Sequence, residues 1–119
     1  MSDGLKGIKT VREFELKGKT VLTMSNNTSE PIMTGENYSI EYFENGKWKT
    51  IDAFQYLFFN SIGYLIASRE SKDFDINFLG DKHQYVKGKY RLVKNYVMDK
   101  DTAPKTSHNL YFEFAVNWI

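Results

Sequence analysis

The chain has 119 residues, of which 41% are hydrophobic and 16% aromatic, and its 16 basic and 15 acidic side chains leave a net charge of +1. This length suits one domain, and the composition is too apolar and too weakly charged for a disordered chain. The charge balance argues against a dedicated nucleic-acid binder, and the lack of cysteine excludes disulfides, thiolate metal sites and a cysteine nucleophile.

The N-terminal residues carry no targeting signal. Residues 1–6 lack the apolar centre of a signal peptide, and no stretch reaches the roughly 18 apolar residues of a transmembrane helix. We expect no membrane span, a single domain over residues 1–119, and a flexible segment over residues 1–7. The chain is then either cytosolic or a mature piece whose leader lies elsewhere.

Apolar and polar residues alternate with a period of two along most of the chain, which is the pattern of half-buried β-strands. In chain order, the predicted strands cover residues 11–16, 19–25, 38–44, 47–51, 72–78, 89–97 and 109–118. Seven or eight short strands with a turn about every ten residues predict a sandwich or barrel.

The predicted turns fit between these strands. Asn45-Gly46 tolerates the positive φ angles of a tight hairpin and joins two strand-like runs. Residues 26–31 and 80–84 are predicted loops, and residues 98–107 form a polar connection to the last strand. Residues 52–60 fit either one helical turn or a loop that plugs the core.

Several segments then resemble a known family in their order and spacing. They are the Asn-rich end of 21–28, the strand–hairpin–tryptophan run 38–48, the run from 62–66 through 70–72 into 74–77, and 88–94. Together they resemble a bacterial immunoglobulin-like domain over about residues 21–97. Such domains occur in lipoproteins, surface proteins and sensor proteins, especially of Gram-positive bacteria. The chain departs from the family's usual Pro-Gly turns, with Ala67-Ser68-Arg69 and Lys87-Gly88 in their places.

The resemblance implies an immunoglobulin-like Greek-key β-sandwich of seven to eight strands. It implies a non-catalytic binding or accessory domain of a bacterial protein, with a cell-envelope or extracellular location and another protein as partner. Two alternatives stay open: a small cytosolic or phage-encoded regulator or inhibitor, and a carbohydrate-binding module.

The acidic and histidine residues do not form a recognisable reaction centre. Asp73 and Asp75 share one face of a predicted strand and fit a solvated surface better than a glycosidase pair. His83 and His108 are too few for a zinc site in a chain without cysteine. We therefore expect no catalytic residue, no metal site, no cofactor and no nucleic-acid partner.

Three residues have predicted structural roles. Tyr90 follows a turn just inside a strand, so its hydroxyl is expected to bond back to the loop as a tyrosine corner. Trp48 is predicted as a core residue in preference to a sugar-stacking platform. Lys94 shares its strand face with Tyr90, so its stem is expected to cover the edge of the core.

The aromatic residues suggest a partner surface. The chain has two Trp, eight Tyr and nine Phe, and a sandwich core is only about 10 Å thick, so some rings should lie outside it. The candidate partner-binding residues are Phe43, Tyr56, Phe58, Phe59 and Tyr64. Alternatively, residues 52–60 fold over one end of the sandwich and bury these rings. The C-terminal strand, which runs to Ile119 without a charged tail, is a candidate edge, so the chain is expected to be a monomer or an edge-strand dimer.

Overall fold

The structure, a computed structural model, describes residues 19–55, 63–98 and 107–116 and is all-β within them. Its elements are β1 (Lys19–Ser25), β2 (Ile32–Thr34), β3 (Ser39–Glu44), β4 (Lys47–Thr50), the 3₁₀ turn η1 (Asp52–Phe54), β5 (Tyr64–Ile66), β6 (Ser71–Asn77), β7 (Gly88–Met98) and β8 (His108–Val116). None of the described segments contains a helix long and apolar enough to cross a membrane.

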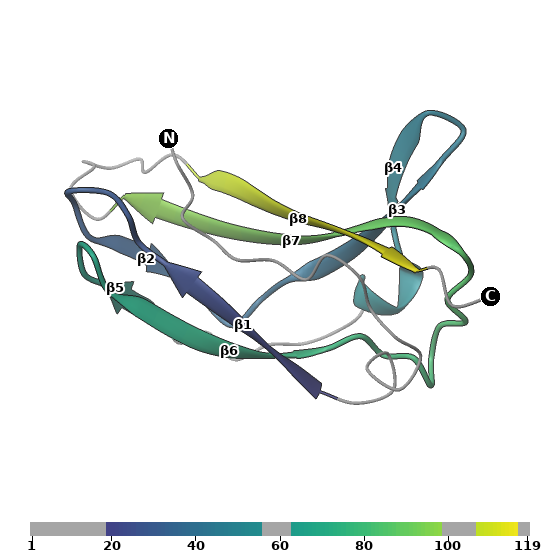
Figure 1. The fold of residues 1–119 in the computed structure, drawn as a ribbon, viewed down its shortest axis with the longest axis horizontal. Helices are drawn as coiled ribbons and strands as arrows, with labels where there is room; N and C mark the ends of the chain where they lie inside the picture. The colour runs from purple at the N-terminus through teal and green to yellow at the C-terminus, as the bar shows by residue number, and fades with distance from the viewer. Residues whose placement is uncertain (1–18, 56–62, 99–106, 117–119) are drawn as a thin grey trace.

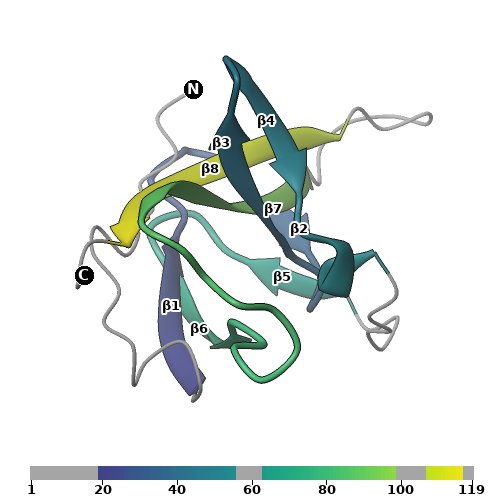
Figure 2. The same ribbon diagram turned by 90° about the vertical axis from the view of Figure 1, so that its right-hand side faces the viewer.

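The strands form two antiparallel sheets that face each other, as expected for an immunoglobulin-like β-sandwich (Figure 1). β1 and β6 pair along seven residues in one layer. In the other layer β7 is the central strand. β8 pairs with one edge of β7, and β3 and β2 pair one after the other with its opposite edge. β4 then pairs with β3, and β5 pairs with β2. Seen end-on, β1 and β6 lie on one side of the molecule and β7 and β8 on the other (Figure 2).

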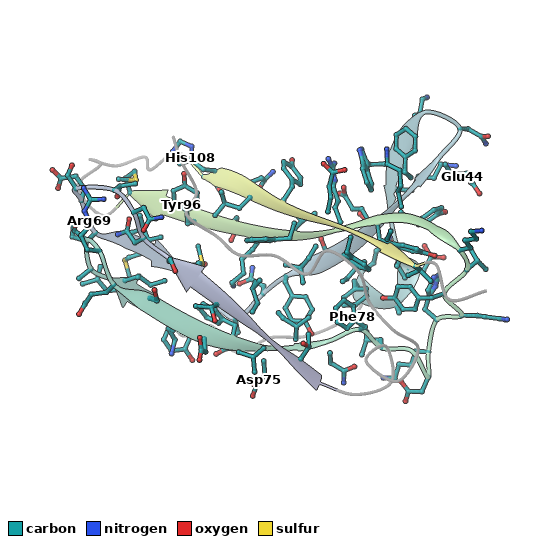
Figure 3. The ribbon with its side chains drawn as sticks, in the orientation of Figure 1. Glu44, Arg69, Asp75, Phe78, Tyr96 and His108 are labelled. Carbon is teal, nitrogen blue, oxygen red and sulfur yellow. The ribbon has the colours of Figure 1, made fainter. Side chains whose placement is uncertain are left out.

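Strict alternation of side chains produces the core between these layers. In β8, Leu110, Phe112, Phe114 and Val116 are buried and the residues between them are more exposed. Phe78, which follows β6, is fully buried and points into the space between the layers (Figure 3). Its ring centroid lies 5.5 Å from that of Phe114, so an aromatic contact joins the two layers.

The β3–β4 hairpin extends beyond the body of the sandwich (Figure 1). Its turn residues Asn45 and Gly46 have φ angles of 54° and 76°, as the Asn-Gly pair predicts. At the tip Glu44 accepts a hydrogen bond from the Lys49 ammonium at 3.1 Å (Figure 3). Because the hairpin extends past the end of the β1–β6 sheet, the inner face of the hairpin has no second sheet to pack against.

One edge of β7 pairs with two strands in succession. Residues 90–93 of β7 pair with β3, and residues 97–98 pair with β2. Lys94 lies between these two ladders, and its ammonium donates hydrogen bonds to the carbonyls of Gly35 and Asn37, the latter at 3.2 Å. The expectation that only its stem covers the core edge is therefore wrong, since the whole side chain is 1% exposed.

Most predicted strands appear within a residue or two of their expected bounds, and the strand over 19–25 is confirmed at both ends. β2 and β5 were not predicted as strands, because three residues are too few to show alternation. The ambiguous segment 52–60 begins with the 3₁₀ turn η1, in which Phe54 is buried. The predicted strand over 11–16 lies outside the described residues, as does the predicted flexible segment 1–7.

Candidate interaction surface

The outer face of the large sheet carries a group of aromatic and basic side chains. Strand register places Phe43 opposite Trp48 in the hairpin, and Arg91 of β7 opposite Glu41 of β3 and Glu113 of β8. We call the set Phe43, Trp48, Lys89, Arg91 and Tyr111 the outer-face patch.

Arg91 lies at the centre of this patch, with an aromatic ring on each side. Its guanidinium carbon is 4.3 Å from the centroid of the Trp48 ring and 4.0 Å from that of Tyr111. Its Nε donates a hydrogen bond to Glu41 Oε1 at 2.6 Å. Guanidinium–aromatic contacts of this kind are each worth about 0.5–1 kcal/mol at exposed sites, so the Arg91 side chain is held in one position.

Phe43 and Lys89 extend the patch toward the hairpin. Phe43 is 39% exposed and packs edge-on against Trp48 at 5.1 Å between ring centroids. The Lys89 ammonium lies 4.8 Å from the Phe43 centroid. The patch therefore presents rigid rings and basic groups to solvent, together with the exposed ring of Tyr111.

The predicted partner-binding residues do not form one surface in the described part of the chain. Phe43 is exposed on the outer face, whereas Tyr64 of β5 is half-buried and packs against the core at 5.8 Å from Phe74. A hydrogen bond with Glu36 raises the pKa of Tyr64. Tyr56, Phe58 and Phe59 lie outside the described residues.

The predicted core position of Trp48 is wrong. Trp48 is half-buried on the outer face, where Phe43 and Arg91 cover it. Alternation correctly separates its side from that of Lys47 and Lys49. However, β4 belongs to a hairpin that extends past the second sheet, so the inner side offers the ring no core to enter.

Tyr90 makes the contacts that define a tyrosine corner. Its hydroxyl donates to the carbonyl of Val86 at 2.7 Å and accepts from the amide of the same residue at 3.0 Å. The ring is buried and stacks on Phe114 at 5.6 Å. Burial raises the pKa of the Tyr90 hydroxyl, although its hydrogen bond with the Val86 backbone acts in the opposite direction.

Sequence reasoning missed Arg91 and Tyr111 as members of a surface. It placed Lys89 and Arg91 on the polar face of their strand but found no exposed aromatic residue beside them on that face of the strand. The rings come instead from the neighbouring strands β4 and β8. The available signal was the outward position of Tyr111 in its own alternation, but matching it to Arg91 needs the strand register.

A cleft of about 190 Å³ lies at the end of the sandwich near the hairpin, lined by Tyr42, Glu44, Ile51, Asp52, His83, Gln84, Val86 and Tyr90. Burial lowers the pKa of His83, although the nearby Asp52 opposes this shift. The His83 ring also packs edge-on against Tyr85 at 4.8 Å between centroids. This contact indicates that His83 has a packing role in its loop.

Within residues 19–55, 63–98 and 107–116, no three acidic or histidine side chains are grouped so as to hold a metal ion. Asp73 and Asp75 are exposed, and Asp73 accepts a hydrogen bond from the Thr23 hydroxyl at 2.8 Å. Asp75 projects outward from the lower sheet (Figure 3). His108 stacks on Tyr96 at 5.1 Å.

The family model for the bacterial Ig-like domain matches residues 8–114. The chain belongs to the bacterial Ig-like domain family. No curated protein and no solved structure matches it. The match covers more of the chain than the 21–97 span over which the motifs resemble the family, and it agrees with the two-sheet architecture. Bacterial Ig-like domains are generally accessory, non-catalytic modules.

Proposed function

We propose that this bacterial Ig-like domain is a non-catalytic binding module that docks another protein on its outer-face patch. The observation that carries the proposal is the position of Arg91 between the rings of Trp48 and Tyr111. Tryptophan, tyrosine and arginine are the residues enriched at the energetic centres of protein interfaces. Their fixed positions reduce the entropy lost when a partner binds.

The charges of the face indicate the kind of partner. Arg91 has a carboxylate partner in Glu41, whereas Lys89 is exposed and forms no ion pair among the described residues. The partner that fits presents apolar side chains to the rings and a carboxylate to Lys89. Electrostatic attraction of this kind chiefly affects the association rate and specificity.

The experiment is a photo-crosslinking capture followed by a binding measurement. A crosslinking residue at Ala115, an outward position of β8, identifies the partner in host extract, and the purified pair then gives a dissociation constant. We expect Trp48→Ala and Arg91→Lys each to weaken binding about tenfold or more, because both remove the stacked arrangement. Arg91→Lys keeps the charge and so isolates the role of the planar guanidinium.

Leu65→Ser is the matched control, since Leu65 is 58% exposed on β5, outside the patch. It should bind as the unmodified protein does. The proposal is overturned if both patch variants bind with unchanged affinity. It is also overturned if the captured protein is a second copy of this chain, which would assign the patch to a homodimer.

We further propose a bacterial cell-envelope location, which is supported by family membership. Fractionation of the host with an antibody against this domain tests it. Recovery with envelope fractions is expected, and recovery with cytosolic enzymes would favour the regulator or inhibitor alternative.

A further inference from the structure

The outer face also contains a groove beyond the patch. Its volume is about 200 Å³, and its lining residues are Asn37, Tyr38, Ser39, Val93, Asn95 and Asn109. These residues come from β3, β7 and β8 and from the loop before β3. The floor is therefore the surface of a sheet, which is a rigid base for a ligand.

The residues that line the groove are uncharged, and most of them are polar. Three of its six lining residues are asparagines, and Ser39 adds a hydroxyl. Each asparagine amide offers donors and an acceptor together, as sugar hydroxyls do. None of the lining residues is charged, which leaves no cation to attract phosphate or carboxylate ligands.

An aromatic ring stands beside this groove. Tyr111 pairs in register with Val93, and its hydroxyl lies 3.5 Å from Nδ2 of Asn109. Arg91 covers one face of the Tyr111 ring, so the 43% exposed area belongs to the other face and the rim. A rigid ring with one open face can stack on the C–H face of a pyranose.

We infer that this groove is a binding site for one sugar unit of a neutral glycan, which stacks on Tyr111 and bonds to Asn95 and Asn109. The inference does not depend on the proposed protein partner. Drug-sized ligands occupy roughly 300–1,000 Å³, so a groove of about 200 Å³ takes a single ring of a longer chain.

The test is a nuclear magnetic resonance titration of the full chain with cellohexaose, mannohexaose and chitohexaose in turn. At least one of the three should shift the backbone amide signals of Ser39, Val93 and Asn109 in a saturable way. Asn95→Ala and Tyr111→Ala should each weaken that binding about tenfold, because each removes a contact to the sugar. Circular dichroism confirms that the variants are folded.

Asn27→Ala is the matched control, because it removes an exposed asparagine outside the groove. Trp48→Ala separates the two proposals, since it should weaken the protein partner and leave glycan binding intact. The inference is overturned if none of the three oligosaccharides shifts these signals at millimolar concentration. It is equally overturned if binding survives both groove substitutions.

Discussion

Lys94 occupies an unusual position for a charged side chain. It lies at 1% exposure within the sandwich, with its ammonium over the Phe74 ring at 4.3 Å and hydrogen bonds to two carbonyls. These contacts compensate part of the cost of removing the charge from water. Burial nevertheless dominates, and it lowers the pKa of Lys94 from 10.5 to about 8, although Glu36 acts in the opposite direction.

This lowered pKa has a predictable effect on stability. Between pH 8 and 10.5 the unfolded chain binds the lysine proton and the folded chain releases it, so Lys94 favours folding more as the pH rises through this range. Lys94→Met removes this dependence. From pH 8 to 10, the free energy of unfolding of the unmodified protein should increase relative to that of the variant.

Denaturant titrations at several pH values measure this difference. Tyr38, Tyr85 and Tyr90, whose pKa values burial raises, titrate in both proteins and so cancel in the comparison. A pH-independent difference would contradict the assignment of Lys94 as the titrating group.

The Tyr90 hydroxyl provides a second prediction at this scale. Tyr90→Phe removes both hydrogen bonds to Val86 and leaves the ring packing in place. We expect a loss of about 1 kcal/mol in the free energy of unfolding, seen as a lower denaturation midpoint. Tyr111→Phe is the control, because its hydroxyl is on the exposed outer face, and it should leave the midpoint unchanged.

Among the elements, the β3–β4 hairpin depends on its turn. Gly46 has a φ angle of +76°, and an added Cβ would meet no atom within 4 Å. The cost of Gly46→Ala therefore comes from the backbone conformation alone, and we expect about 1 kcal/mol. Gly46→Asn should cost less, because asparagine tolerates this conformation. Equal midpoints for the alanine variant and the unmodified protein would contradict this account.

The sequence predicted those elements whose local signals agree with their surroundings. The Asn45-Gly46 turn and the alternation in β8 depend on neighbouring residues alone, so they could be predicted without the fold. β2 owes its existence to pairing with β5 and β7, which a three-residue run cannot reveal. The prediction placed Trp48 on the wrong face of the sheet. Alternation assigns side chains to the two sides of a strand, but it does not show which side faces the other sheet.

The candidate site was harder to predict than the fold for a related reason. Phe43 was expected on the surface and lies there. Arg91 and Tyr111 become part of the same patch only through side-chain contacts across three strands. Their separation in sequence gives no hint that the guanidinium lies between two rings. The groove beside them likewise combines residues 37–39, 93, 95 and 109, which only the register of the sheet brings together.

For the molecule as a whole, Phe78 connects the two layers. It is 0% exposed and contacts the rings of Phe114 and Tyr85, while the Tyr85 hydroxyl donates to its carbonyl at 2.7 Å. Phe78→Ala should cost about 3–5 kcal/mol, because a large cavity opens where the sheets meet. Val21→Ala, at a residue that is 54% exposed on β1, should cost less than about 0.5 kcal/mol.

Thermal and denaturant unfolding give the loss of stability in both variants. If the two sheets share one core, tryptophan fluorescence and far-ultraviolet circular dichroism should give coincident transitions in each protein. Separate transitions for the two probes would show that the layers unfold independently.

The break between the two ladders on one edge of β7 has a consequence for evolutionary variation. The Lys94 ammonium reaches its carbonyl acceptors only because the chain leaves the sheet at residues 35–37. In a homologue whose β2 and β3 form one uninterrupted strand, main-chain amides of the sheet would bond to those carbonyls, which could then no longer accept from the lysine. We therefore expect homologues that lack the interruption at residues 35–37 also to lack a basic residue at position 94.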